Sequence, residues 1–488
     1  MRFTLERLTA RINEIGRYIP CRIQPLTDWR ILPEEAATRQ IPAPQDTRWQ
    51  PFNISTWWGA DDKQPWAWFC CQVQVPAEWR AERAAIRLRL GETNRSEYPE
   101  ALAYLDGREW QGVDRWHDTI ELSEATCSQE SILVALEVWR GRNYSAERFW
   151  QADLISIDSE TEGFYYDAAV ALEVVKTLPE ADYTRIRLLN ALEKAFLVVD
   201  LREPIGADFY ASVQQARQTL KQAIAAENLA PLREKVRAIG HAHIDVAWLW
   251  TLAQTRQKTA RTFATALRLM ERYPTYHFIS SQAQLYQYIQ QDYPDLLAEI
   301  QQRVKEGRWE VNGGTWVEMD TNVTSGESLV RQFLYGRQLF RELFGTDGDI
   351  LWLPDVFGYS GALPQLIVRA GLRYFMTTKI SWSQYNRFPY DTFSWQGIDG
   401  TQVLTHFATT PSNNWFYTYN GDLSPAKVLG TWAANTGKEF TDEVLMSYGW
   451  GDGGGGPTVE MIEKGVRLAD HPGAPRWYWA PLTAFSTV

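Results

Sequence analysis

Cysteine and histidine, the residues that build most disulfide and metal sites, are scarce in this sequence. Its 488 residues include only four cysteines and six histidines. The cysteines show no Cys-x-x-Cys spacing, so we expect neither a disulfide framework nor a cysteine metal site at Cys21, Cys70, Cys71 and Cys127. Such sparse cysteine usage is typical of a reducing compartment. We therefore expect a cytoplasmic protein.

Long apolar runs and basic clusters are also missing. No stretch reaches the roughly 18 apolar residues that would span a bilayer. The N-terminal residues 1–12 mix both charge signs and lack the apolar core of a signal peptide. The net charge is −11, and no cluster of Lys and Arg is present to displace counterions from phosphates. These absences argue against a membrane protein and against a nucleic-acid partner.

Aromatic residues, in contrast, are abundant. The chain contains 23 tryptophans, 22 tyrosines and 20 phenylalanines. Their flat apolar faces suit stacking against the C–H faces of sugars, although core packing uses most such residues. The hydrophobic fraction of 45% and the charged fraction of 22% are those of a globular protein. The length predicts two or three domains.

The pattern of short strands and helices predicts three segments. Residues 1–163 are expected to form an all-β sandwich with a leading helix, in which Asp106-Gly107 marks a hairpin. Helical spacing over 164–232 predicts a helical linker. Residues 233–488 are expected to form an α/β domain that is barrel-like, with parallel strands alternating with helices.

Within 233–488 the alternation can be followed element by element. Apolar runs predict strands at 236–239, 277–280, 309–312, 350–353, 374–377, 403–407 and 444–447. Amphipathic spacing predicts helices at 252–272, 296–305, 325–343, 362–370, 425–436 and 458–468. In parallel sheets and barrels, ligands gather at the carboxyl ends of the strands. We therefore expect the functional residues directly after these strands.

The first strand of this domain ends in a His-x-His-x-Asp pattern. In an extended backbone His241, His243 and Asp245 leave the same face and can meet at one point. Imidazole nitrogen and carboxylate oxygen are ligands that zinc accepts, and a catalytic site needs about three of them. In the alternative interpretation the histidines merely cap backbone groups at the strand end.

Acidic residues follow several of the other strands. Glu318, Asp320, Asp355 and Asp452 all lie where strand ends are expected to converge, together with Lys379. Paired carboxylates, one of them with a raised pKa, are what glycoside hydrolysis requires.

Each of these residues also has a structural interpretation. Asp355 could cap the helix that begins near Ser360, although Ser360 itself is the better cap. Asp452 lies in the glycine-rich stretch Gly449–Gly456, which either brings backbone close to a ligand or is a flexible turn. Trp248 is either a core residue or one wall of a sugar pocket.

Several motifs in order along the chain resemble the catalytic domain of family 38 glycoside hydrolases, the class II α-mannosidases, and most closely their cytosolic branch. The resemblance covers about 238–458. It rests on Gly240-His-Ala-His-Ile-Asp-Val-Ala-Trp248, Gly313-Gly-Thr-Trp-Val-Glu-Met-Asp320, Trp352-Leu-Pro-Asp-Val-Phe-Gly-Tyr-Ser360, Thr378-Lys-Ile-Ser-Trp382, Trp395-Gln-Gly-Ile-Asp-Gly400 and Gly451-Asp-Gly-Gly-Gly-Gly-Pro-Thr458.

The resemblance implies a retaining, metal-dependent α-mannosidase acting on terminal α-mannosyl residues of oligosaccharides. It implies Zn²⁺, with Co²⁺ as a substitute, held by His243, Asp245 and Asp355. Asp355 would also be the nucleophile and Asp452 the general acid/base. Trp248 and Phe357 would line the sugar pocket.

The chain departs from the family at its end. Family members continue further, and the His-Asp motif that supplies their fourth zinc ligand has no equivalent here. We therefore expect the chain to be truncated at its C-terminus, with weak metal affinity and reduced activity, and we expect exposed apolar edges to favour homo-oligomers.

Two alternatives to the mannosidase stay open at this point. One is an amidohydrolase-like or deacetylase-like metal hydrolase, although such a site usually needs more histidines. The other is a non-catalytic carbohydrate-binding fragment.

Overall fold

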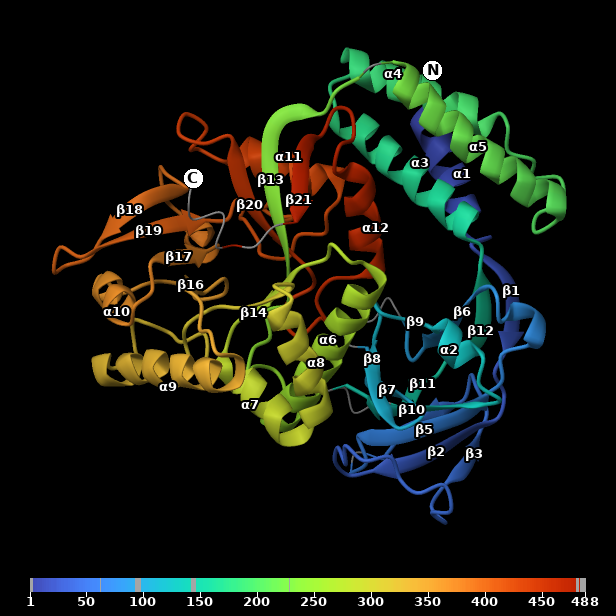
Figure 1. Ribbon diagram of the computed structural model, residues 1–488, viewed down its shortest axis with the longest axis horizontal. Coiled ribbons are helices and arrows are strands. Elements are labelled where there is room, and N and C mark those ends of the chain that lie inside the picture. Colours follow the sequence, from blue (N-terminus) through green and yellow to red (C-terminus); the bar gives the residue numbers. More distant parts are fainter. Residues whose placement is uncertain are drawn as a thin grey trace. The chain divides into compact units, whose positions relative to one another are not determined.

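The computed structural model describes residues 3–61, 63–92, 98–141, 146–227, 229–479 and 482. The chain divides into two compact units, Met1–Leu229 and Ala230–Val488, which are described separately. The described residues form twelve α-helices and several sheets (Figure 1). None of these helices combines the length with the apolar character that a bilayer span requires.

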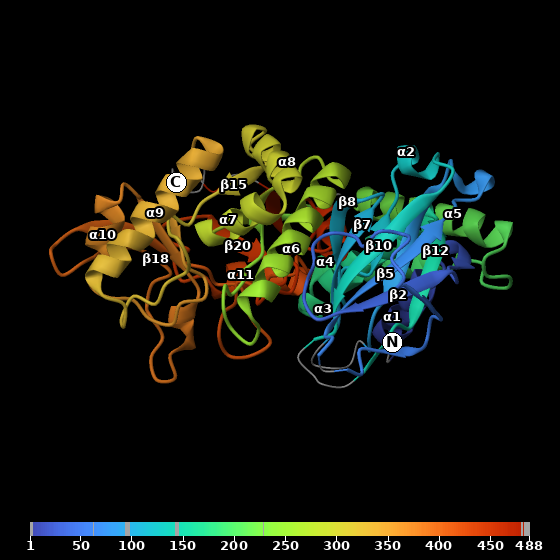
Figure 2. The same ribbon diagram turned by 90° about the horizontal axis from the view of Figure 1, so that it is seen from below.

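Two antiparallel sheets form most of the first unit. One has the order β1 (Pro20–Pro25), β12 (Gln151–Ile157), β6 (Arg83–Arg89) and β9 (Thr119–Glu121). The other has the order β3 (Gln50–Phe52), β2 (Trp29–Glu34), β5 (Trp66–Val73), β10 (Ile132–Trp139), β7 (Glu100–Leu105) and β8 (Arg108–Val113). The strands β2, β5, β10 and β7 run side by side (Figure 2).

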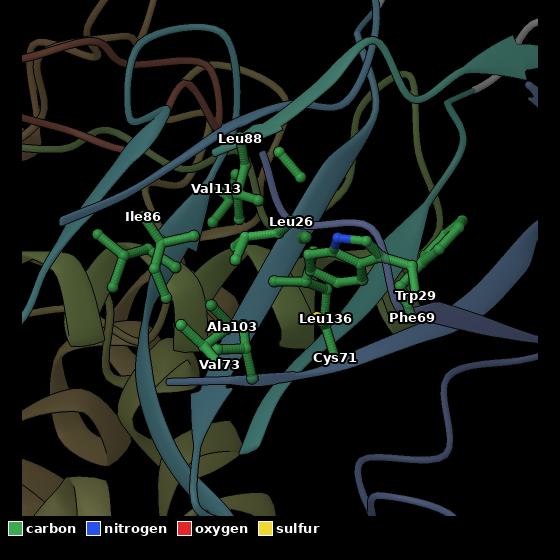
Figure 3. Close-up of a cluster of buried hydrophobic side chains, with 14 of the residues drawn as sticks. Leu26, Trp29, Phe69, Cys71, Val73, Ile86, Leu88, Ala103, Val113 and Leu136 are labelled. Atoms are coloured by element: carbon green, nitrogen blue, oxygen red, sulfur yellow. The ribbon is translucent and has the colours of Figure 1, made fainter. Parts of the chain in front are cut away.

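The two sheets share one core, so they form a sandwich. Ile86 and Leu88 of β6 belong to the same buried cluster as Phe69 and Val73 of β5 and Leu136 of β10 (Figure 3). The alternation of inward and outward side chains along these strands explains why the apolar residues reach this cluster.

The predicted hairpin at Asp106-Gly107 joins two neighbouring strands. Asp106 (φ 49°) and Gly107 (φ 89°) both have positive φ between β7 and β8. Two residues with positive φ are what a tight type I′ hairpin turn needs. The local turn signal therefore predicted this connection correctly.

Four longer helices complete the first unit. They are α1 (Thr4–Gly16), α3 (Ser159–Thr177), α4 (Tyr183–Phe196) and α5 (Ala207–Ala226), and α3 contacts the other three (Figure 1). Asp158 and Asp182 begin α3 and α4 by accepting backbone N–H groups of the first turn. Shorter elements of this unit are β4 (Trp57–Trp58), η1 (Ala77–Trp79), α2 (Glu124–Cys127) and β11 (Glu147–Arg148).

The second unit alternates strands and helices. One parallel sheet has the order β15 (Trp309–Val311), β14 (Phe278–Ser280), β13 (Leu232–His241) and β20 (Glu443–Tyr448), and β21 (Pro475–Trp479) also pairs with β13. A second sheet has the order β16 (Ile350–Trp352), β17 (Tyr374–Thr377), β19 (Gln402–Phe407) and β18 (Thr392–Gln396), of which only β18 is antiparallel.

Helices connect these strands. They are α6 (Leu252–Arg272), α7 (Ala283–Asp292), α8 (Pro294–Lys305), α9 (Gly326–Phe344), α10 (Leu363–Arg369), α11 (Pro425–Ala434) and α12 (Val459–Leu468), with the 3₁₀ turn η2 (Lys379–Trp382). A buried cluster unites side chains of both sheets, including Ile239, Ile279, Trp352, Met376 and Leu445. The carboxyl ends of the parallel strands are thereby brought to a common region.

Some elements differ from the sequence-based prediction. The prediction did not include helix α7 or the antiparallel strand β18, and it marked no individual strand at β1. Most residues of β1 are exposed, so it lacks a clear apolar alternation. Strand β18 forms the edge of its sheet and is likewise only partly buried. Edge strands give weak periodic signals because neither face must be fully apolar.

Candidate active site and metal centre

The two histidines at the carboxyl end of β13, the first strand of the second unit, have different surroundings. Strand β13 ends at His241, whose Nε2 accepts a hydrogen bond from Trp352 Nε1 at 3.1 Å. Burial, helped by the nearby His243, lowers the pKa of His241 to about 3. His241 is therefore a neutral core residue bonded to β16. The His-x-His-x-Asp pattern predicted that the side chains of His241 and His243 meet at one point. The His241 ring bonds Trp352 instead.

His243 lies between carboxylates from three strand ends. Its Nε2 is 3.4 Å from Asp245 Oδ1 and 3.3 Å from Asp355 Oδ2, and its Nδ1 is 3.1 Å from Glu318 Oε1. Burial acts to lower the pKa of His243, but the negative charges of Glu318, Asp245 and Asp355 outweigh it and raise this pKa well above its ordinary value. The imidazole is thus surrounded by negative charge.

Asp355 has a second cationic neighbour. Lys379, which follows β17, is buried and places its Nζ 2.5 Å from Asp355 Oδ1. Burial acts to raise the pKa of Asp355, but the close positive groups of His243 and Lys379 outweigh it and hold this pKa below its usual range. Asp355 is therefore ionised at neutral pH, and its two oxygens face different partners.

Asp452 lies in the loop after β20 and has the opposite pKa shift. Tyr419 donates its hydroxyl hydrogen to Asp452 Oδ1 at 2.6 Å. Partial desolvation, together with the negative charges of Asp355 and Asp245, raises the pKa of Asp452. Burial is the largest of these causes, and the Tyr419 hydrogen bond and the nearby His243 oppose it. Its backbone φ of +52° is unusual for a residue other than glycine.

The glycine-rich loop around Asp452 packs against the site. A Cβ on Gly451 would lie 2.5 Å from the Tyr419 ring and 3.2 Å from His243 Cβ. A Cβ on Gly449, whose φ is +126°, would lie 2.2 Å from the carbonyl oxygen of His241. Only glycine fits such close approaches. The loop is therefore shaped to bring backbone next to His243.

The residues gathered here fit a metal ion. Ligand atoms of His243, Asp355 and Asp452 all lie within 4.8 Å of one another. Among the described residues, His243 Nε2 and Asp245 Oδ2 are buried and have no hydrogen-bond partner. Zn–N and Zn–O bonds of about 2.0–2.1 Å in a tetrahedron separate the ligand atoms by about 3.3 Å. The separations of His243 Nε2 from Asp245 and Asp355 are close to this value.

Exposed aromatic residues come from the loops that carry Asp245 and Asp355. Phe357 is 66% exposed, and the ring of Trp382 meets it edge-on at 5.5 Å. Trp248 is also exposed, in the loop after β13, and makes an edge contact with Trp250. Exposed rings at strand ends are suited to contact a ligand, and a packing role would bury them.

Two further residues complete the site but had not been singled out. Tyr419 is buried, contacts the His243 ring at 5.2 Å and holds Asp452. Gln282, whose φ is +67°, donates to the Ile244 carbonyl at 2.8 Å and accepts from the Glu318 backbone N–H at 3.1 Å. Because Gln282 lies directly after strand β14, the strand-end rule could have marked it as a site residue. Nothing in the local sequence marks Tyr419.

Comparison with known proteins places the second unit in a family. The family model described as "Glycosyl hydrolases family 38 N-terminal domain" matches residues 233–487. Alpha-mannosidase G of Dictyostelium discoideum is 45% identical over 242 residues, which are 50% of this chain and 22% of that protein.

Two other relatives match more of the chain. Alpha-mannosidase of Saccharomyces cerevisiae is 37% identical over 328 residues, covering 65% of this chain and 29% of the relative. Alpha-mannosidase 2C1 of Homo sapiens is 33% identical over 470 residues, covering 92% of this chain and 42% of the relative. The chain thus spans less than half the length of these three relatives.

Proposed function

Because the chain belongs to glycosyl hydrolase family 38, we propose that it carries the catalytic site of a retaining α-mannosidase that removes terminal α-mannosyl residues from oligosaccharides. The names of the relatives support the substrate class. The observation that carries the proposal is the pair Asp355 and Asp452, whose pKa values are shifted in opposite directions. An ionised carboxylate beside a carboxyl with a raised pKa suits the nucleophile and the acid of a glycosidase.

The short distance between the carboxylates supports retention of configuration. The candidate ligand atoms of Asp355 and Asp452 lie within 4.8 Å of each other. Retaining glycosidases hold their two carboxyl groups about 5–5.5 Å apart, whereas inverting enzymes leave about 6.5–9.5 Å for a water molecule. The spacing therefore favours direct attack by a carboxylate.

In the proposed reaction an oxygen of Asp355 bonds to the anomeric carbon while the glycosidic C–O bond breaks. Asp452 gives its proton to the departing oxygen, and Tyr419 orients Asp452 through their hydrogen bond. Asp452, now ionised, then takes a proton from water, whose oxygen bonds to the anomeric carbon and releases Asp355. Lys379 keeps Asp355 ionised and fixes one of its oxygens.

We propose that His243, Asp245 and Asp355 hold Zn²⁺, with Co²⁺ as a substitute. A bound divalent ion supplies Lewis-acid attraction for hydroxyl groups of the sugar and so orients it. Glu318 fixes the His243 ring through Nδ1, as carboxylates commonly do behind metal-bound histidines. Trp248 and Phe357 are proposed to line the pocket of the terminal mannose.

The remaining parts of the proposal concern organisation. We propose an α/β barrel-like catalytic domain over 233–488, a helical linker over 164–232 and a sandwich with a leading helix over 1–163. A cytoplasmic location is supported by the four free cysteines. Association into homo-oligomers, without a nucleic-acid or membrane partner, is also proposed.

The test uses the full-length protein and the substrate 4-nitrophenyl α-mannoside. Asp355→Asn removes the attacking charge and should lower kcat by at least about 10³-fold. Glu439→Gln changes an exposed acid in the turn before β20 and should leave kcat within about twofold. Proton NMR of the first product should show the α-anomer. Unchanged turnover in Asp355→Asn contradicts the proposal, and so does a β-anomer as first product. If the wild-type protein binds the mannoside without turning it over, the result supports the carbohydrate-binding alternative.

A further inference from the structure

Four aromatic rings form a continuous row that starts beside the candidate nucleophile. We call Phe357, Trp382, Phe416 and Trp415 the aromatic ridge. The ring centroids of Phe357 and Trp382 are 5.5 Å apart, those of Trp382 and Phe416 3.9 Å, and those of Phe416 and Trp415 5.5 Å. The four residues come from the loops after β16, β17 and β19, so tertiary structure alone assembles the row.

The ridge is exposed at both ends. Phe357 and Trp415 are each 66% exposed, while Trp382 and Phe416 stack on each other between them. Exposing large rings in a continuous row costs hydrophobic free energy, and such apolar surface marks a binding site. The open faces at the ends are therefore available to a ligand, and the central stack supports them.

The loop that carries Trp415 and Phe416 is tied down. Its ends pair at Pro411 and Tyr417, and Lys427 Nζ donates to the Pro411 carbonyl at 2.5 Å. Trp382 Nε1 donates to the Tyr417 carbonyl at 3.1 Å, and the Tyr417 N–H donates to Ser381 Oγ at 3.1 Å. The rings are thus positioned before any ligand arrives, which reduces the entropic cost of binding.

The ridge is continuous with the catalytic groups. Lys379 Nζ lies 2.5 Å from Asp355 Oδ1 and also sits over the rings of Phe357 and Trp382, at 4.6 Å and 3.8 Å from their centroids. A single cation therefore joins the nucleophile to the first two rings. From that point the row continues through Phe416 to Trp415.

We propose that the aromatic ridge beyond Phe357 binds leaving-group sugars of a neutral oligosaccharide, with Trp415 stacking on a ring beyond the bond that is cut. This inference rests on the proposed function. An enzyme that removes terminal residues holds only one sugar on the nucleophile's side of that bond, so an extended surface contacts the rest of the chain. The apolar faces of uncharged pyranose rings match the open faces of the ridge.

The test compares two substrates of the full-length enzyme. In α-mannosyl fluoride the leaving group is fluoride, so no sugar reaches Trp415, whereas α-linked mannotriose has further sugars that can. Trp415→Ala should lower kcat/KM for mannotriose about tenfold relative to its effect on the fluoride, as loss of one stacking contact predicts. Trp415→Phe should recover most of this loss because it keeps a flat ring.

Phe440→Ala serves as the matched control. Phe440 is a 75% exposed aromatic residue that precedes β20, at the opposite end of that strand from Asp452. This variant should leave the ratio of the two kcat/KM values unchanged. An equal loss on both substrates after Trp415→Ala, or no loss on either, would overturn the proposal. If Trp415→Ala changed the oligomeric state and left the ratio of the two kcat/KM values unchanged, a second copy of the chain would cover the ridge. That outcome would also overturn the proposal.

A separate measurement distinguishes this inference from the proposed function. If the wild-type enzyme turns over neither substrate, the proposed function has failed. Calorimetric titration of mannotriose into the Asp355→Asn variant then still tests the ridge. Adding Trp415→Ala should weaken that binding about tenfold. Equal affinity with and without Trp415 contradicts the inference.

Discussion

At the scale of single residues, His243 organises the site because each of its ring nitrogens faces a carboxylate. Nε2 faces Asp245 and Asp355, and Nδ1 faces Glu318. The Glu318 oxygen also accepts the Ser281 hydroxyl at 3.0 Å. This bond fixes the Glu318 carboxylate and, through it, the orientation of the ring. Glu318 is thus expected to position the imidazole without touching substrate.

The first prediction follows for Glu318→Gln. Glutamine keeps the shape of the side chain but loses the negative charge that faces Nδ1. The affinity for Zn²⁺ should fall about 10–100-fold, measured by competition with a chelator in the full-length protein. Glu439→Gln makes the same replacement at an exposed glutamate in the turn before β20, so it is the control and should keep the wild-type affinity. Equal affinities of wild type and Glu318→Gln would exclude the positioning role.

The second prediction concerns Lys379→Met. Methionine keeps most of the length and apolar contact of lysine beneath Phe357 and Trp382 but removes the charge 2.5 Å from Asp355. The loss of this preorganised charge should lower kcat/KM for 4-nitrophenyl α-mannoside about 10²-fold. Lys379→Arg should restore part of the activity because it keeps the charge. Steady-state kinetics would refute the prediction if the methionine variant equalled wild type or if arginine restored nothing.

At the scale of elements, long helices with clear amphipathic spacing were predicted well. The prediction of 252–272 agrees with α6, and the strands at 350–353 and 374–377 agree with β16 and β17 within a residue. Helix α6 also begins with a capping box, in which Thr251 and Gln254 bond each other's backbone. Helix α7 was missed because it follows β14 after only two residues, so the strand and the helix merge into one apolar stretch.

The loop between β20 and α12 supplies the third prediction. Gly449→Ala would place a methyl group 2.2 Å from the His241 carbonyl at a φ of +126°, so backbone must shift. The free energy of unfolding should fall by about 3 kcal/mol or more. Gly307→Ala is the matched control, since Gly307 has a φ of +72° with nothing near its Cβ. It should cost only about 1 kcal/mol.

Urea denaturation of both variants checks this prediction. If the two variants lost the same free energy of unfolding, the loop would not approach β13 as closely as described.

At the scale of the whole molecule, a buried carboxyl links stability to pH. Glu310 of β15 accepts the Leu482 N–H at 3.0 and 3.1 Å, and burial raises its pKa from 4.5 to about 7 despite that bond. The folded state therefore binds more protons than the unfolded state between pH 4.5 and 7. The free energy of unfolding therefore falls as the pH rises through that window, and Glu310 accounts for a loss of up to about 3 kcal/mol.

The fourth prediction is that Glu310→Gln stabilises the protein at pH 8 and has little effect at pH 5, where Glu310 is largely protonated. Midpoints of urea unfolding at the two pH values measure this. Glu306→Gln is the control, because hydrogen bonds from Gln302 and Arg303 lower the pKa of this exposed glutamate, so its removal should give no gain at pH 8. A gain for Glu310→Gln that is independent of pH would contradict the explanation.

What the sequence determined by itself is local. Periodicity along the chain decides which segments become helices or strands, and residue type decides which side chains can bind a metal or move a proton. This was enough to name candidates at the ends of apolar runs, namely His241, His243, Asp245, Glu318, Asp320, Asp355, Lys379 and Asp452. The family resemblance added roles to these positions, and those roles stay predictions.

What only the tertiary structure decided is which of these side chains meet. It turned His241 toward Trp352 while His243 faces the carboxylates, and it brought Tyr419 and Lys379 to their partners. The row from Phe357 to Trp415 likewise has no counterpart in sequence spacing. The physical reason is that such contacts join residues far apart in the chain, so they depend on how strands and loops pack together.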